Sequence, residues 1–216
     1  MRHELSLTNH LYSYDDLSQA AYLAEQNNFD LVSGPLSYIT YLQTFLTKTK
    51  IGAIIGYPYG ISPVSIKCRE IAEAIELKVD IIDIVLNHFL MLNQDLKKLD
   101  EEIKTCTVLA DIGKVNFAYI LDYPTLGDDD LLGACYLLLQ HNVFSVLTTV
   151  GVTQDDLAEN ILACQKISKT KIKPILATNN YNPSLEKSIK KAGVNTIRLN
   201  SYYNARRFFS IDNVKI

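Results

Sequence analysis

An aspartate interrupts one of the most apolar runs of the chain. In Ile81-Ile-Asp-Ile-Val85, side chains alternate along the expected strand, so Asp83 shares a face with Ile81 and Val85. A carboxylate in such surroundings needs hydrogen-bond partners. Two interpretations follow: Asp83 moves protons in a reaction, or it is a structural aspartate held by neighbouring groups.

Other polar side chains follow the ends of apolar runs, where the strands of a sheet would bring them to one edge. Their amides, hydroxyls and carboxylates can hydrogen-bond a polar ligand, although turns rich in asparagine and aspartate also form for local reasons. The four histidines show no metal-ligand spacing, so we expect no metal and no cofactor. The residues expected to bind a ligand are Asn87, Asp122, Thr148, Asn179, Asn180, Asn200 and Ser201.

Composition and charge argue against several classes of protein. The 216 residues carry a formal net charge of −3 without a basic stripe, so no nucleic-acid partner is expected. Four separated cysteines without a CxxC pair indicate buried, reduced thiols. No apolar run approaches a membrane span, and the first residues lack the features of a signal peptide. We expect a soluble, cytoplasmic protein with no membrane partner.

Short runs rich in Ile, Val, Leu and Tyr alternate with longer stretches of helical period. The pattern predicts helices that include Pro63–Glu76, Asp155–Ile167 and Ser184–Lys191. It predicts eight strands, at His3–Thr8, Asp30–Ser33, Ile51–Ile55, Asp80–Leu86, Asn116–Asp122, Val143–Thr148, Ile172–Ala177 and Thr196–Leu199.

The helix at Pro63–Glu76 shows the period most clearly. Ser62 is placed to cap it, with Pro63 at the first helical position, where the missing N–H costs nothing. The apolar side chains fall on one face of this helix. The opposite face is expected to expose to water the side chains of Lys67, Glu70 and Glu73.

The order of these elements favours one α/β domain over residues 1–216. Strands such as Ile51–Ile55 are apolar throughout, as expected when both faces of a parallel sheet are covered. No GxGxxG follows the first strand, which favours a closed (β/α)8 barrel, the TIM-barrel fold, over a doubly wound sheet. The pattern alone leaves a flavodoxin-like layout open.

Residues 54–60, Ile-Ile-Gly-Tyr-Pro-Tyr-Gly, resemble the third-strand signature Ile-Gly-Phe-Pro-x-Gly of deoxyribose-phosphate aldolases. Residues 79–87 are similar to that family's fourth strand, Val143–Val152 to its sixth, and residues 191–201 to its eighth. The order and spacing of the motifs hold from residue 54 to residue 201. The resemblance implies a (β/α)8 barrel and an enzyme that reversibly joins acetaldehyde to glyceraldehyde 3-phosphate.

The resemblance also implies Schiff-base chemistry. In the family a lysine amine forms an imine with the aldehyde, a second lysine lowers the pKa of that amine, and a carboxylate helps to move protons. The carboxylate matches Asp83, but the Schiff-base lysine of the sixth strand matches Leu147. The second lysine matches Leu176, and a lysine that some members carry on the fifth strand matches Ala118. We expect the two leucines to pack inside the barrel and Schiff-base activity to be absent.

The family's phosphate site is altered as well. The resemblance places it at glycines after the seventh strand and at Gly-x-Ser-Ser after the eighth, where backbone N–H groups face the phosphate. The matching stretches here read Thr178-Asn-Asn180 and Arg198-Leu-Asn-Ser201. Ser201 is kept and the glycines are not.

Three functions stay open. The first is a pseudoenzyme that binds a small polar or phosphorylated ligand, such as a sugar phosphate or an aldehyde. The second is a different carbonyl or sugar reaction that uses Asp83, Asp122 and the asparagines. The third is an active aldolase with a relocated lysine, for which Lys173 is the nearest candidate in sequence, although it lies on the strand face opposite Leu176. A homodimer is also left open.

Overall fold

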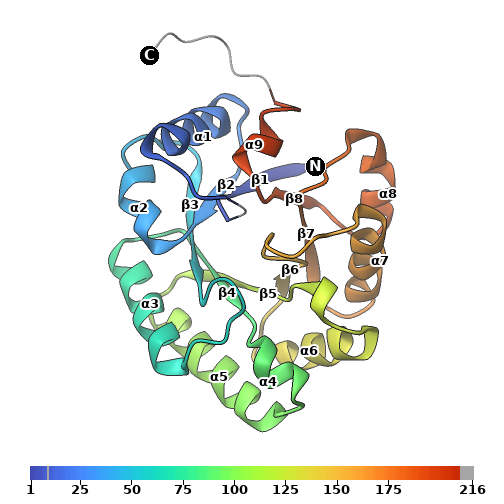
Figure 1. Ribbon diagram of the computed structural model, residues 1–216. Helices are drawn as coiled ribbons and strands as arrows, with labels where there is room; N and C mark the ends of the chain where they lie inside the picture. Colours follow the sequence, from blue (N-terminus) through green and yellow to red (C-terminus); the bar gives the residue numbers. More distant parts are fainter. Residues whose placement is uncertain (9, 210–216) are drawn as a thin grey trace.

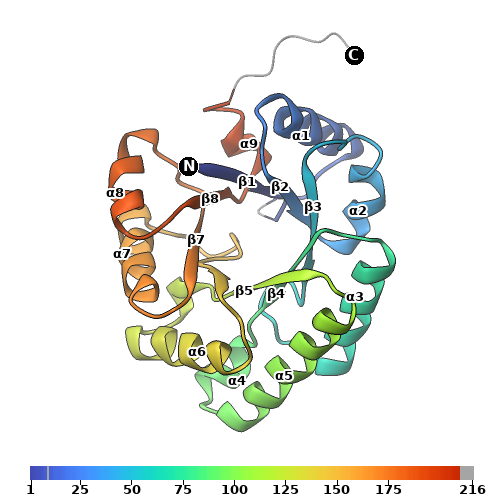
Figure 2. The ribbon, with the colours of Figure 1, turned by 180° about the vertical axis from the view of Figure 1, so that it is seen from behind.

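Eight parallel strands close into a barrel in the computed structural model, which describes residues 1–8 and 10–209. Each strand pairs with the next, and β1 pairs with β8. Figure 1 shows the strands inside a ring of helices, and Figure 2 shows the same ring from behind. The strands are β1 (Arg2–Ser6), β2 (Leu31–Gly34), β3 (Lys50–Ile55), β4 (Ile81–Val85), β5 (Asn116–Ile120), β6 (Ser145–Leu147), β7 (Lys173–Thr178) and β8 (Thr196–Leu199).

Helices follow the strands and cover the outside of the barrel. Two 3-10 helices, η1 (Tyr123–Thr125) and η2 (Pro183–Leu185), accompany them. The α-helices are α1 (Tyr14–Gln26), α2 (Leu36–Leu42), α3 (Val64–Glu76), α4 (His88–Leu92), α5 (Leu96–Ile112), α6 (Asp128–Gln140), α7 (Leu157–Ser168), α8 (Glu186–Lys191) and α9 (Tyr202–Ala205).

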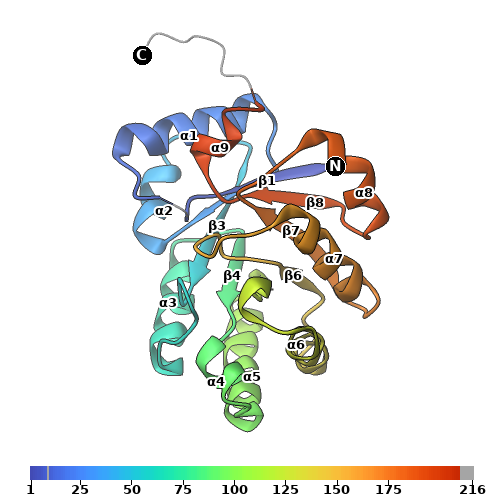
Figure 3. The ribbon, with the colours of Figure 1, turned by 45° about the vertical axis from the view of Figure 1, so that its right-hand side comes forward.

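The prediction of a (β/α)8 barrel is therefore confirmed, and the flavodoxin-like alternative is wrong. The predicted domain 1–216 also includes residue 9 and residues 210–216, which lie outside the described residues. The short last helix α9 lies beside α1 (Figure 3), and the Tyr202 hydroxyl on α9 donates to Gln19 on α1 at 2.8 Å.

The apolar side chains form two separate cores, because alternate residues of each strand face opposite sides of the barrel wall. The larger core lies between the strands and the helices. The smaller one, called here the lumen cluster, lies inside the barrel and has Tyr57 and Ile175 packed against it. The lumen cluster consists of Ile54, Val85, Ala118, Ile120, Leu147, Val150 and Ala177.

Two predictions about the third helix are wrong. Pro63 itself occupies the N-cap position and the helix begins at Val64, so Ser62 does not cap it. Lys67, expected in water, is completely buried between the barrel and α5. Its ammonium donates to the carbonyl of Val85 at 2.9 Å and pairs with Glu102 at 2.6 Å. The helical period did not predict the burial of Lys67 because the carboxylate that pairs with it lies on another helix, α5.

The cysteines are free thiols, as expected from their spacing. Cys106, Cys135 and Cys164 are buried, and burial raises the pKa of the Cys106 and Cys135 thiols to about 12. Cys68 is only partly buried. Among residues 1–8 and 10–209, no helix is long and apolar enough to cross a membrane.

Candidate functional site

Asp83 sits inside the barrel in a network of charged and polar side chains from four strands. Its side chain is fully buried, and Oδ2 accepts a hydrogen bond from Ser33 Oγ of β2 at 2.8 Å. The same oxygen accepts from Arg198 Nη1 of β8. Arg198 also donates through Nε and Nη2 to Oε2 of Glu4 on β1, at 2.9 and 2.7 Å. The cation that faces Asp83 is therefore a guanidinium.

Arg198 is a permanent charge in this network. Burial lowers its pKa, but the nearby carboxylates of Asp83 and Glu4 outweigh burial and raise the pKa above its usual range. A guanidinium that stays protonated cannot add to a carbonyl, so it holds Asp83 in place without acting as a nucleophile. Sequence reasoning missed this role, although an arginine within the apolar run Thr196–Leu199 was a signal of a buried partner.

The structure separates the three positions matched to the family's lysines. Leu147 belongs to the lumen cluster, as expected, and Ala118 belongs to it as well. Leu176 belongs instead to the core between strands and helices, so the expectation that it packs inside the barrel is wrong. Its neighbours Ile175 and Ala177 face the lumen. Neighbouring side chains of a strand face opposite sides of the barrel wall, so a match displaced by one residue would account for this difference.

The lysines lie away from Asp83. Within the described part of the chain, Lys67 is the one buried lysine, and it bonds to Val85 and Glu102 in the helix layer. Lys173 is the first residue of β7 and its side chain is exposed. Since β7 begins at Lys173, this side chain lies at the end of the barrel opposite to the face that carries active sites in such folds.

Tyr57 closes the barrel above the lumen cluster. It follows β3, packs against that cluster, and its hydroxyl donates to the carbonyl of Thr8 at 2.7 Å. Val85 lies two residues beyond Asp83 on β4, about 7 Å nearer the mouth. An apolar layer therefore separates Asp83 from the loops at the carboxyl ends of the strands.

A small pocket lies on top of this closure. Its volume is about 290 Å³, close to the lower end of the range for small-molecule sites. Thr8 is buried within it, and Thr8 Oγ1 has no hydrogen-bond partner among the described residues. This mouth pocket is lined by Leu7, Thr8, His10, Leu11, Pro35, Tyr38, Tyr57 and Val152.

Two of the predicted ligand residues, Asp122 and Thr148, organise the loop after β6. Asp122 is fully buried with a left-handed backbone (φ 48°). Its carboxylate accepts from Thr149 Oγ1 and Thr153 Oγ1, each at 2.5 Å, and from the Val150 N–H at 3.2 Å. Thr148 Oγ1 accepts from the Ala177 N–H at 3.1 Å. These contacts fix the backbone of the mouth.

Asn87 and His88 are turned toward the helix layer. Asn87 caps α4 by accepting from the Leu90 N–H at 3.2 Å, and its amide donates to Glu102 at 2.9 Å. His88 is buried, and its Nε2 lies 2.9 Å from the carbonyl oxygen of Leu121. Both polar atoms of Asn87 thus have partners within the protein, and its amide nitrogen bonds to the carboxylate of the Lys67–Glu102 pair.

The predicted residues after β7 and β8 lie together at the mouth. The Asn179 amide donates to the carbonyl of Gly151 at 3.0 Å, and Asn180 Nδ2 donates to the carbonyl of Asp155 at 2.6 Å. Asn200 is buried, and its Nδ2 has no partner among the described residues. Ser201 is fully buried at the start of α9. The structure brings these four together from adjacent loops, as expected for the carboxyl ends of neighbouring strands.

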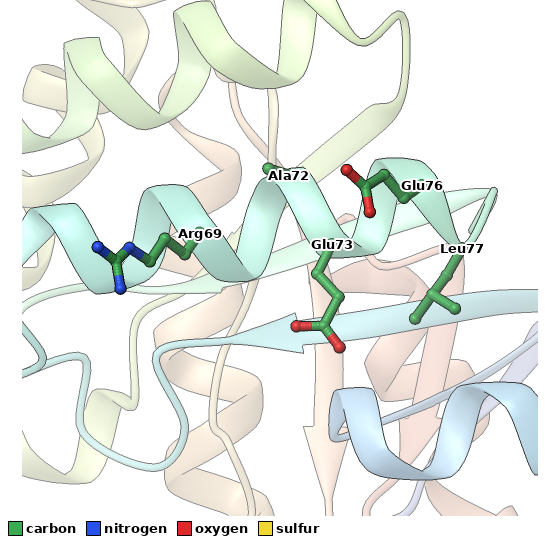
Figure 4. Close-up of a pocket in the computed structure, with 5 residues that line it drawn as sticks. All are labelled: Arg69, Ala72, Glu73, Glu76 and Leu77. Atoms are coloured by element: carbon green, nitrogen blue, oxygen red, sulfur yellow. The ribbon is translucent and has the colours of Figure 1, made fainter.

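A larger hollow, of about 620 Å³, lies on the outer face of α3 (Figure 4). Its lining comes from one helix and its cap, and includes Arg69, Glu73 and Glu76. No strand end delivers a side chain to it, so its chemistry is that of a solvated helix face despite its size. Among residues 1–8 and 10–209, no three His, Cys, Asp or Glu side chains are grouped as a metal would require.

Known proteins resemble this chain in sequence and in fold. No protein-family model matches it. The deoxyribose-phosphate aldolase of Caldicellulosiruptor saccharolyticus is 27% identical over 155 residues, which cover 69% of this chain and 70% of that protein. A solved structure described as "QR15, an Aldolase" superposes with a TM-score of 0.82 at 20% identity, covering 96% of this chain and 93% of the other.

A second solved structure, the tetrameric deoxyribose phosphate aldolase from Aeropyrum pernix, gives a TM-score of 0.77 at 15% identity and covers 95% of this chain and 88% of the other. At these identities the solved structures show the shared fold alone. Together with the curated relatives, they show that the chain is a divergent relative that resembles the deoxyribose-phosphate aldolases.

Proposed function

We propose that this chain is an aldolase-like barrel without Schiff-base activity, whose mouth binds a small polar ligand. The observation that carries the proposal is the composition of the lumen. Leu147 and Ala118 stand where the family's motifs carry lysines, and the cation beside Asp83 is Arg198. Without a neutral amine there is no imine to accept the electron pair when an aldol bond breaks.

The mouth pocket supports ligand binding. Tyr38 and Tyr57 supply apolar ring faces, which suit the carbon skeleton of a sugar or an aldehyde. Thr8 Oγ1 in this lining is a buried polar atom without a partner among the described residues. Since an unpaired buried polar group is costly, a ligand hydroxyl or carbonyl that pairs with one gains affinity.

The test combines turnover and binding. Purified protein incubated with 2-deoxyribose 5-phosphate is expected to release no acetaldehyde, as measured with a coupled alcohol dehydrogenase. Small sugars and aldehydes are expected to raise the melting temperature. Thr8→Val, which replaces the unpaired hydroxyl by a methyl group, is expected to weaken that shift, whereas Arg69→Ala on the outer face of α3 leaves it unchanged. Steady release of acetaldehyde would contradict the proposal.

A second candidate is a carbonyl or sugar reaction in which Asp83 moves a proton. It is favoured by Asp83 Oδ1, which is buried and has no hydrogen-bond partner among the described residues. Turnover of a substrate by the wild type, lost in Asp83→Asn, supports this candidate over simple binding. Lys173 stays a prediction for imine formation, and a homodimer stays a prediction for the assembly.

A further inference from the structure

Asp155 occupies a position in the mouth where barrels of this kind often bind an anion. The loops after strands seven and eight frequently form a phosphate site from backbone N–H groups. Here Asp155 comes from the loop after β6 and is only 3% exposed. Its Oδ1 accepts from the Asn179 N–H at 3.2 Å, and its Oδ2 accepts from Thr178 Oγ1 at 2.6 Å.

The next backbone N–H of the same loop also has a hydrogen-bond acceptor within the protein. Asn180 donates its backbone N–H to Thr178 Oγ1 at 2.9 Å, so the hydroxyl links this donor to the carboxylate of Asp155. The donors that would face a ligand's phosphate thus already surround an intramolecular anion.

The space between the loops after β6 and β8 is filled as well. Gly151 has a positive φ of 93°, and a Cβ built on it would lie 2.7 Å from the Cβ of Asn200. The side chain of Asn179 joins the same contact through its bond to the Gly151 carbonyl. A phosphate would have to displace Asn200 or move the loop.

The charge outside this loop also opposes a phosphate. A hollow of about 650 Å³ borders Asp155, and its lining contains the carboxylates of Asp155, Asp156 and Glu159 but no lysine or arginine. The adjacent hollow shares Asn180 and Asn182 with this one, and its lining includes Arg207. Like charges in the first hollow repel a phosphate dianion.

We infer that the carboxylate of Asp155 replaces a ligand phosphate at this position, so that the mouth selects an unphosphorylated sugar or aldehyde. The identity of the ligand rests on the proposed function, whereas the role of Asp155 stands on the contacts above.

A chemical-rescue experiment tests the role of Asp155. Asp155→Ala removes the internal anion and frees its donors, so its melting temperature in chloride falls below that of the wild type. Inorganic phosphate at matched ionic strength is expected to restore much of that loss. It should leave unchanged the wild type and the control Asp129→Ala, which removes an exposed carboxylate from the first turn of α6. Equal stabilisation of all three proteins, or no rescue of Asp155→Ala, overturns the inference.

If Asp155→Ala does not fold, Asp155→Ser removes the charge and shortens the side chain, which leaves room for phosphate, and it keeps one polar atom. Isothermal titration with inorganic phosphate should then give affinity at least about tenfold tighter than that of the wild type, a difference of about 1.4 kcal/mol. An affinity equal to that of the wild type overturns the inference.

Paired titrations test the selectivity of the wild type. 2-Deoxyribose is expected to bind at least about tenfold more tightly than 2-deoxyribose 5-phosphate, and the reverse order overturns the selectivity. If neither sugar binds, the proposed function fails for this ligand class and the inferred selectivity fails with it. The rescue by phosphate still decides separately whether Asp155 stands in for an anion.

Discussion

Placing a lysine at position 147 should create an amine inside the barrel, whereas a lysine at position 176 should not. Both leucines are at most 1% exposed, so either substitution buries an ammonium group. Leu147 lies in the lumen cluster and Leu176 between the strands and the helices. The two variants therefore bury an ammonium group at a similar cost, but they place it on opposite sides of the barrel wall.

The magnitude follows from the protonation of the buried amine. Burial lowers the pKa of a lysine below its unfolded value of about 10.4. If the folded pKa is about 7 or lower, releasing the proton at pH 7 costs about 5 kcal/mol. The unfolded state then binds more protons than the folded state, so the stability of both variants rises with pH up to about 10.4. A loss of this size approaches the total stability of many domains, which favours working near pH 9.

The assay is reductive trapping at about pH 9. The neutral amine attacks the carbonyl carbon of acetaldehyde, water leaves, and borohydride reduces the imine to a secondary amine that mass spectrometry detects. Leu147→Lys is expected to gain an adduct on the new lysine because its side chain lies in the lumen, on the side of the barrel wall that faces Tyr57 and the mouth pocket. Leu176→Lys should gain none there. Equal labelling at the two positions, or labelling of position 176 alone, would refute the assignment of the two faces.

Three further predictions concern stability, each measured by chemical denaturation. Arg198→Met leaves two buried carboxylates without their cation and should cost about 3–5 kcal/mol; a cost below about 1 kcal/mol would show that the network is not held as described. Lys67→Met should cost a similar amount because Glu102 keeps its buried charge, and adding Glu102→Gln should recover part of the loss; no recovery would argue against the pair. Burial raises the pKa of Glu25, but the backbone N–H groups of residues 47–49 outweigh it and lower the pKa to about 2. Glu25→Gln should therefore be less stable than the wild type at neutral pH, and the difference should vanish as pH falls from about 4.5 to about 2, because the stabilising charge is lost; a difference that does not change with pH would contradict this.

The barrel was predictable because its signals are local and repeated. Apolar runs without alternation mark strands covered on both faces, and a helical period between them marks the covering helices. All eight predicted strands overlap observed ones, and Thr196–Leu199 agrees at both ends. The other strands differ from the prediction by one or two residues at one or both ends because loops, not apolar runs, decide where pairing stops.

The site was less predictable because its polar groups are satisfied by distant partners. Arg198 meets Glu4 across 194 residues of sequence, and Lys67 meets Glu102 across 35. Neither contact follows from the period of a single element. Asp122, expected to face a ligand, bonds to Thr149 and Thr153 in the loop after β6. Such contacts between side chains of different loops follow no fixed spacing in the sequence.

The misplacement of Leu176 has a related cause. A strand motif fixes which residues alternate, but a match displaced by one residue reverses which side chains face the lumen. The pairing of Leu147 with Ile175 and of Leu176 with Ile197 settles the register, and this information is absent from a single strand. Because Ile175 and Ala177 are also apolar, the correction leaves an apolar lumen at β7.

We propose that the wild-type barrel offers no amine to an aldehyde. The most direct measurement is reductive trapping of the unmodified protein with acetaldehyde and borohydride, followed by peptide mapping of every lysine. Labelling at Lys173 or Lys67 is expected to be no greater than at exposed surface lysines, with no single dominant site. A stoichiometric adduct on one lysine, blocked by a competing sugar, would contradict it.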